Sequence, residues 1–151
     1  MKQLLFCSLF LFVTASVNAQ QGMTSIESRY SSEQTAERLL NLLEENGLTV
    51  FERINHHEGA ASVEMELPET ILIIFGNPAL GTPLMQCAPT VAIDLPQKML
   101  IRENEDGDVH ISFNTPEYLK ERHNIEGCDR ELEKIDGSLR NFASEAAGRE
   151  G

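Results

Sequence analysis

The sequence predicts an α+β domain in which helices cover one face of a β-sheet. Ile71 to Phe75 is an unbroken apolar run, rich in β-branched residues and closed by Gly76, which predicts a strand buried on both faces. The turn Glu105-Asp106-Gly107 predicts a β-hairpin. Near the C-terminus, apolar residues recur at steps of four, three, four, three and four: Cys128, Leu132, Ile135, Leu139, Phe142 and Ala146. A helix with one continuous apolar face must cover something, and a sheet is its natural partner.

In the first half of the chain we expect one helix flanked by two strands. Ser31 and Gln34 form a capping box ahead of a helical apolar pattern that ends at Gly47, which predicts a short N-terminal helix. Strands are expected over residues 23–30, weakly, and over 48–54. His56 to Ala61 should be an exposed connection, and Ser62 to Leu67 a half-exposed strand or an extended arm ended by Pro68.

The second half contains the turns that follow the central strand. Asn77-Pro78 and Thr82-Pro83 each pair an N-cap with a residue suited to the first helical position, which predicts one kinked helix or two helical turns. The segments expected next are a short extended piece from Val91 to Leu95, hairpin strands over 98–102 and 109–113, and a helical turn begun by Asn114-Thr115-Pro116-Glu117. Residues 147–151 are expected to form a disordered tail.

The first 19 residues have the order of a secretory signal peptide. Lys2 precedes an apolar run over residues 4–13 and the small-residue site Val17-Asn18-Ala19. A membrane anchor is the alternative, but the run is shorter than the ~20 residues a span needs. We therefore expect cleavage after Ala19, a periplasmic or secreted location, and one mature domain over residues 20–146.

The charge balance disfavours two classes of partner. The chain has 12 basic and 24 acidic residues, a net charge of -12, and loss of Lys2 with the signal peptide would make it more negative still. Such a surface repels phosphate backbones and anionic lipid headgroups, so we expect neither nucleic acid nor membrane as the partner of the mature chain. High negative charge also serves solubility, so it indicates no positive partner.

Two cysteines remain after removal of Cys7 with the signal peptide. In an oxidising compartment, Cys87 and Cys128 could form a disulfide worth roughly 4 kcal/mol. Cys128 also falls on the apolar helical stripe, where a lone buried cysteine serves as a small hydrophobe. The sequence leaves both interpretations open.

The segment from Ile74 to Ile101, with the hairpin that follows, resembles the bacterial and archaeal domain-of-unknown-function 302 family. Its most specific pieces are Gly76-Asn77-Pro78, Gly81-Thr82-Pro83-Leu84-Met85-Gln86 and Asp94-Leu95-Pro96, within a similarity over about residues 26–142. The resemblance implies an α+β domain with a strongly curved antiparallel sheet, and a homodimer. It does not imply an activity, and the cofactor, if any, stays unknown.

One set of side chains has the chemistry of soft-metal ligands. His56, His57, Met85 and Cys87 suit copper, and imidazole with thioether or thiolate also ligates haem iron. Adjacent histidines on an extended segment point to opposite sides, and no Cys-x-x-Cys or His-x-His spacing is present. The alternative is an exposed His pair, a core methionine and a helix-end cysteine.

The helix starts after the central strand could hold a small ligand. Backbone N–H groups at such starts bind anions, and the residues we expect to contribute are Asn77, Gly81, Thr82, Met85 and Asp94. Lys98 or Arg102 would supply the cation that the negative surface requires. Structural capping explains the same residues without a ligand.

A nucleophilic mechanism has one candidate constellation, Cys87 with His56 or His57 and Asp94. It lacks a motif such as Gly-x-Ser-x-Gly. The leading hypothesis is therefore a non-catalytic exported module that binds a small ligand or anion between the sheet and residues 77–88. Copper or haem handling is the second hypothesis, and a thiol-dependent enzyme is the third.

Overall fold

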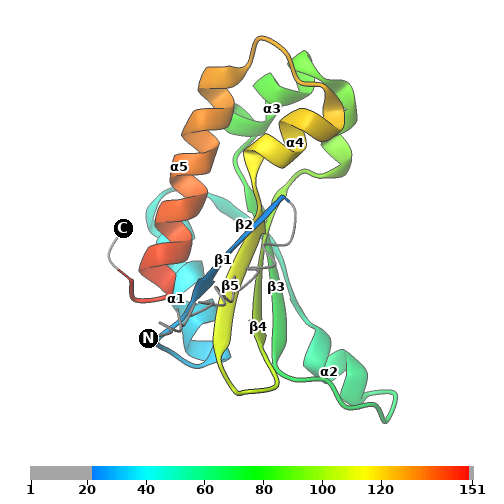
Figure 1. Cartoon of the computed structure of the whole chain (residues 1–151), viewed down its shortest axis with the longest axis vertical. Helices are drawn as coiled ribbons and strands as arrows, with labels where there is room; N and C mark the ends of the chain where they lie inside the picture. Colours follow the sequence, from blue (N-terminus) through cyan, green and yellow to red (C-terminus); the bar gives the residue numbers. More distant parts are fainter. Residues whose placement is uncertain (1–21, 150–151) are drawn as a thin grey trace, which may run out of the picture.

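A five-stranded antiparallel sheet organises residues 22–149, the part of the chain that the computed structural model describes (Figure 1). The strand order is β1-β5-β4-β3-β2. The strands are β1 (Met23–Glu27), β2 (Thr49–Asn55), β3 (Thr70–Gly76), β4 (Gln97–Glu103) and β5 (Val109–Asn114). The helices are α1 (Ser32–Glu45), α2 (His56–Ala61), α3 (Pro78–Cys87), the 3-10 helix η1 (Pro89–Ile93), α4 (Pro116–His123) and α5 (Asp129–Ala146). The expected signal peptide lies outside the described residues.

Strand β3 lies where the apolar run predicts a strand, but it is not buried equally on both faces. Ile71, Ile73 and Phe75 are at most 1% exposed, whereas Leu72 and Ile74 between them are only half-buried. One face therefore packs against helices and the other borders solvent, as in most antiparallel sheets. β3 pairs with β2 on one side and β4 on the other, so it is an interior strand, but the middle strand of the five is β4 and the expected central position of β3 is corrected.

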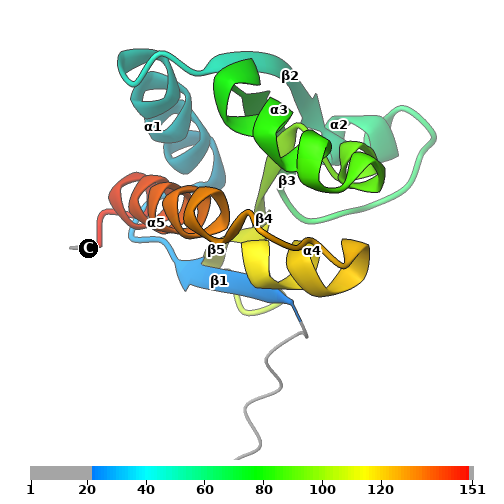
Figure 2. The same ribbon diagram turned by 90° about the horizontal axis from the view of Figure 1, so that it is seen from above.

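Helices α1 and α5 cover the buried face of the sheet (Figure 2). The predicted capping box of Ser31 and Gln34 is present, and α1 stops before Gly47, whose φ is +69°. The five α5 residues of the predicted apolar stripe are all at least nine-tenths buried: Leu132, Ile135, Leu139, Phe142 and Ala146. The α+β class and the antiparallel sheet are thus confirmed. None of the helices within residues 22–149 combines the length and apolar character that a bilayer crossing requires.

Two segments near the sheet edge differ from the sequence prediction. Residues 56–61 form the helix α2, because the side chain of Asn55 accepts a hydrogen bond from the N–H of Glu58 (3.1 Å) and so caps a helical turn. Residues 62–67 contain no strand and fit the alternative of an arm. Val63 and Met65 on this arm are 64% and 66% exposed.

Two further predictions need correction. The extended piece expected over 91–95 is replaced by η1, which Pro89 opens with its fixed φ and in which the N–H of Val91 bonds to the carbonyl of Ala88 (3.0 Å). The tail predicted from residue 147 is ordered at its start. Ala147 is fully buried and its carbonyl accepts from the N–H of Arg29 (3.0 Å), because the end of α5 packs beside the strand β1.

Candidate functional site

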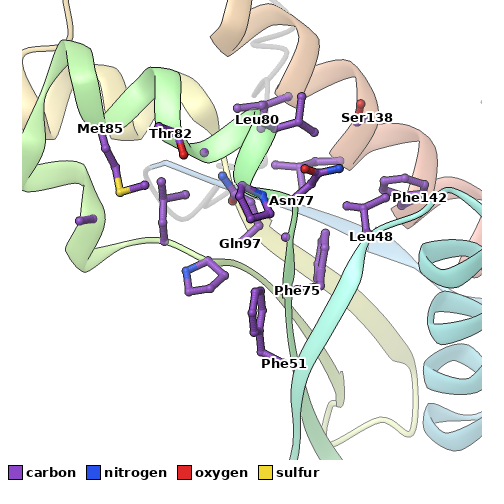
Figure 3. A pocket seen from close by; sticks show the side chains of 18 residues that line it. Leu48, Phe51, Phe75, Asn77, Leu80, Thr82, Met85, Gln97, Ser138 and Phe142 are labelled. Atoms are coloured by element: carbon purple, nitrogen blue, oxygen red, sulfur yellow. The ribbon is translucent and has the colours of Figure 1, made fainter.

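A pocket of about 300 Å³ lies where the end of β3 meets α3, the η1–β4 connection and α5 (Figure 3). Most of its lining is apolar, including Leu48, Phe51, Phe75, Leu80, Leu95 and Phe142. Four side chains add polar atoms: Asn77, Thr82, Gln97 and Ser138. No Asp, Glu, Lys, Arg or His is among the described residues that line it. The pocket therefore suits an uncharged and largely apolar occupant.

A β-bulge positions Phe51 at the pocket. The register of β2 against β3 shifts between Val50 and Glu52, so that Phe51 has no partner residue on β3. A bulge re-aims the extra side chain, and Phe51 remains 53% exposed while it lines the pocket. The sequence carried a signal for this residue, since Phe51 interrupts the apolar alternation of Leu48, Val50 and Ile54.

The start of α3 forms another wall, as the Asn77-Pro78 pattern predicts. The side chain of Asn77 accepts a hydrogen bond from the N–H of Ala79 (2.9 Å), which caps the helix. Gly76 is closely packed at this corner, because a Cβ there would lie 3.4 Å from the Pro96 side chain. Of the predicted ligand-binding residues, Asn77, Gly81, Thr82 and Met85 all line the pocket.

One polar atom beside the pocket has no partner within the described chain. The side-chain nitrogen Nε2 of Gln97 is buried and makes no hydrogen bond. An unsatisfied buried donor costs about 1–3 kcal/mol. Gln97 opens β4 directly opposite Phe75, and opposed residues of an antiparallel pair carry their side chains on the same face. The amide is thus held beside the Phe75 ring, and sequence analysis did not single it out.

A disulfide joins two walls of this site. Cys87 ends α3, Cys128 is the residue before α5, and the two sulfurs are bonded with the Cα atoms 6.5 Å apart. The disulfide interpretation of these cysteines is thus confirmed, and the lone-cysteine interpretation of Cys128 is wrong. Because its sulfur is bonded, Cys87 offers neither a thiolate ligand nor a nucleophile in this state. The metal-binding and nucleophilic roles predicted for Cys87 are therefore wrong for the oxidised protein.

The structure also separates the other predicted metal ligands. His56 and His57 belong to α2, whereas Met85 belongs to α3, and Figure 1 places these helices at opposite ends of the sheet. The ring of His57 contacts the Leu67 carbonyl through Nδ1 (2.6 Å). Within residues 22–149, no three His, Cys, Asp or Glu side chains are grouped as a metal site requires. The four predicted ligands are therefore not brought together at one site within the described residues.

Asp94 lies behind the pocket wall and not in the pocket lining. Its Oδ2 is 2.6 Å from Nε2 of His123 and 3.4 Å from Nε of Arg122, and Nδ1 of His123 is 3.0 Å from the Thr90 hydroxyl. The order hydroxyl, imidazole, carboxylate is that of a hydrolase triad, but none of these three residues lines the pocket. The network connects η1 and the following turn to the end of α4.

The two predicted cations do not serve the pocket. Nζ of Lys98 donates to the carbonyls of Asp94 and Pro96, both at 2.9 Å. Arg102 lies farther along β4, opposite Thr70 and His110 in the strand register. Neither residue lines the pocket, so the anion expected at the helix starts would meet no cationic side chain there.

The fold and site define a small α+β domain with an apolar pocket between its sheet and its helices. The chain belongs to the family described as "Domain of unknown function DUF302", whose match covers residues 24–142. This confirms the resemblance seen in the sequence.

Known proteins of two kinds are similar to this chain. The proteins named "Fluoride-specific ion channel FluC 1" of Brucella suis biovar 1 and Brucella abortus biovar 1 are each 41% identical over 104 residues, 69% of this chain. The chain spans only 41% and 38% of these relatives, so their name describes much larger proteins. A crystal structure titled as an uncharacterized conserved protein DUF302 from Bacillus stearothermophilus matches with a TM-score of 0.75. It covers 84% of this chain and 98% of its own at 16% identity, which supports the fold alone.

Proposed function

We propose that this protein is a non-catalytic binding module that holds a small, neutral, largely apolar molecule in the pocket between β3, α3 and α5. The observation that carries the proposal is a cavity of about 300 Å³ with mainly apolar lining and no charged side chain among its described lining residues. Concave apolar pockets with a few polar groups are the usual sites of small ligands. Since a cavity of about 150 Å³ accepts benzene, this one suits a molecule of roughly a dozen carbon atoms.

The sequence left open whether the ligand is an anion or another small molecule, and we propose a neutral compound. The chain as a whole carries a net charge of -12, and the nearest predicted cation, Lys98, is engaged by two backbone carbonyls. Transfer of an unpaired anion into an apolar pocket is costly. The name of the Brucella relatives refers to fluoride, but the residues that line this pocket within the described chain include no cation to hold a fluoride ion.

Titration with a neutral fluorescent naphthalene, N-phenylnaphthylamine, tests the proposal. We expect saturable fluorescence enhancement, because the dye leaves water for an apolar cavity. Ser138→Phe should abolish it by filling the pocket from α5, whereas Ser138→Ala, which removes the hydroxyl and keeps the space, should not. Addition of sodium fluoride should not change the dye fluorescence of the wild type or of Ser138→Ala. Enhancement that does not saturate, or that survives Ser138→Phe in a folded protein, would contradict the proposal.

We further propose that the protein is exported. The signal-like order of residues 1–19 supports this, and so does a disulfide, since disulfides persist in oxidising compartments. N-terminal sequencing of the protein recovered from a periplasmic extract should begin at Gln20. A chain that starts at Met1 and stays with the cytoplasmic fraction would refute export.

A homodimer is proposed on separate grounds. The family resemblance implies one, and the arm after α2 exposes apolar side chains that a second copy could cover, Val63, Met65 and Leu67. Light scattering after size-exclusion chromatography should give twice the mass of one chain. The double variant Val63→Ser with Met65→Ser should give the mass of a single chain. A wild-type monomer at all accessible concentrations would exclude the dimer.

A further inference from the structure

The side-chain amide of Gln97 presents an unpartnered hydrogen-bond donor at the pocket. Its Nε2 is buried without a hydrogen-bond acceptor among the described residues, and Gln97 lines the pocket. Two other polar groups of the lining are already engaged. Oδ1 of Asn77 accepts from the N–H of Ala79 (2.9 Å), and the Ser138 hydroxyl donates to the Lys134 carbonyl (2.9 Å). Gln97 is therefore a polar group held ready in an apolar environment.

We infer that the ligand is a neutral apolar molecule that carries one carbonyl-type oxygen, and that this oxygen accepts a hydrogen bond from Nε2 of Gln97. The inference rests on the proposed function of the pocket and specifies the class of ligand: ketones, esters or amides with a compact hydrocarbon body. A pure hydrocarbon would fill the same space and leave the amide donor unsatisfied. A carboxylate would supply the acceptor but would bring an unpaired charge.

The position of Gln97 makes this selection geometrically possible. As the first residue of β4 it is paired opposite Phe75, so its backbone is fixed by the sheet. Figure 3 shows the Gln97 side chain next to Asn77 at the centre of the lining, with Phe75 and Phe51 below it. A carbonyl that meets Gln97 would therefore place its hydrocarbon part against these aromatic rings. Flat aromatic or alicyclic bodies suit such a surface.

Two matched probes separate this inference from the proposed function. Naphthyl methyl ketone and ethylnaphthalene have the same carbon skeleton, and only the ketone has an acceptor. Both should displace N-phenylnaphthylamine from the wild-type protein. The ketone should bind about tenfold more tightly, because one hydrogen bond to an otherwise unsatisfied buried donor is gained. The side-chain NH2 signals of Gln97 should shift in NMR spectra with the ketone and not with the hydrocarbon.

Gln97→Leu should remove the preference and retain binding of the hydrocarbon. Replacing the orphaned amide by an apolar group of similar size leaves the fold intact, which the circular dichroism spectrum and melting curve check. Gln86→Leu is the matched control, because Gln86 is exposed on α3 and does not line the pocket. It should leave the tenfold preference unchanged.

Each outcome has a distinct meaning. If neither probe displaces the dye, the proposed function fails and the inference fails with it. If both bind equally to the wild type, or if the preference survives Gln97→Leu, the pocket stands and the role of Gln97 is overturned. The same holds if indole, which offers an N–H donor, binds more tightly than the ketone, because the amide would then present its oxygen.

Discussion

Cys87 at the end of α3 is bonded to Cys128, the residue that precedes α5, across a sequence separation of 41. Both helices line the apolar pocket, so the disulfide fixes one pocket wall to another. Because Cys87 and Cys128 are the only cysteines among the described residues, no free thiol remains there to react. The same covalent bond thus supports the binding proposal and excludes the thiol mechanism in the oxidised protein.

Removal of this disulfide should destabilise the protein without changing its fold. The chain-entropy model gives about 4 kcal/mol for a loop of this length. Urea denaturation of the double variant Cys87→Ala with Cys128→Ala should show a lower midpoint by a corresponding amount, and its affinity for N-phenylnaphthylamine should fall because α3 is released from α5. The unreduced wild type that starts at Gln20, and so lacks Cys7, should not react with iodoacetamide. Rapid alkylation of this shortened, unreduced protein would contradict the disulfide.

Gly137 should be a site of stabilisation. It lies within α5, its φ is not in the left-handed region, and a Cβ at this position would meet nothing within 4 Å. Gly137→Ala should therefore raise the free energy of unfolding by about 0.5–1 kcal/mol. Gly127 provides the contrast, because its surroundings are equally open but its φ is +75°. Gly127→Ala should destabilise, and equal effects of the two variants in urea titrations would refute the backbone argument.

Truncation of two isoleucines should change stability by very different amounts. Ile73 on β3 is fully buried, whereas Ile93 at the end of η1 is 73% exposed. Ile73→Ala should lower the free energy of unfolding by about 2–5 kcal/mol, since it removes buried apolar volume and leaves a cavity. Ile93→Ala should change it by no more than about 0.5 kcal/mol. A large loss from Ile93→Ala would show that this side chain is covered in solution, as a dimer would cover it.

The Asp94 and His123 pair should act as a structural anchor. The His123 side chain is 6% exposed and that of Asp94 is 16% exposed, and their contact connects the turn behind the pocket wall to α4. Asp94→Asn should lower the free energy of unfolding by about 1.5–3 kcal/mol, the range for hydrogen bonds to charged groups. Thr90→Val should have a smaller effect, because Thr90 is exposed. If the wild type hydrolysed a naphthyl ester and Thr90→Val did not, the network would be catalytic and the structural role would be refuted.

The Lys120 and Asp129 contact should appear in titrations. Nζ of Lys120 lies 2.7 Å from Oδ1 of Asp129, and this hydrogen bond with its charge attraction lowers the pKa of Asp129 below its ordinary 3.8. The same contact raises the pKa of Lys120 above 10.5. The contribution of Asp129 to stability is therefore present above pH 3.8 and lost as the pH falls through its lowered pKa.

Both groups are exposed, so salt should weaken the effect. The contribution of Lys120 is present below pH 10.5 and is lost as the pH rises through its raised pKa. NMR titration of Lys120→Met should return the pKa of Asp129 towards 3.8, whereas Lys134→Met should leave it low. An unchanged Asp129 pKa in Lys120→Met would refute the pairing.

Local patterns in the sequence determined the elements of this protein. The capping box at Ser31, the stripe from Leu132 to Ala146 and the apolar run at Ile71 each depend on residues near one another along the chain, and each lies where it was predicted. They also placed four of the five candidate ligand-binding residues at the pocket, because Asn77 to Met85 form one continuous segment. The extended piece expected over residues 91–95 was wrong for a local reason, because Pro89 starts a 3-10 helix there.

Only the tertiary structure decided what these elements enclose. The pairing of Cys87 with Cys128, the separation of the two histidines from Met85, and the contact of Asp94 with His123 join residues far apart in sequence. The pocket owes its apolar character to Phe51, Phe75 and Phe142, which come from three different elements. The position of the unpartnered amide of Gln97 depends on the pairing of β4 with β3, which places Gln97 opposite Phe75. Such relationships are set by packing across the whole fold, and a single sequence carries no direct record of them.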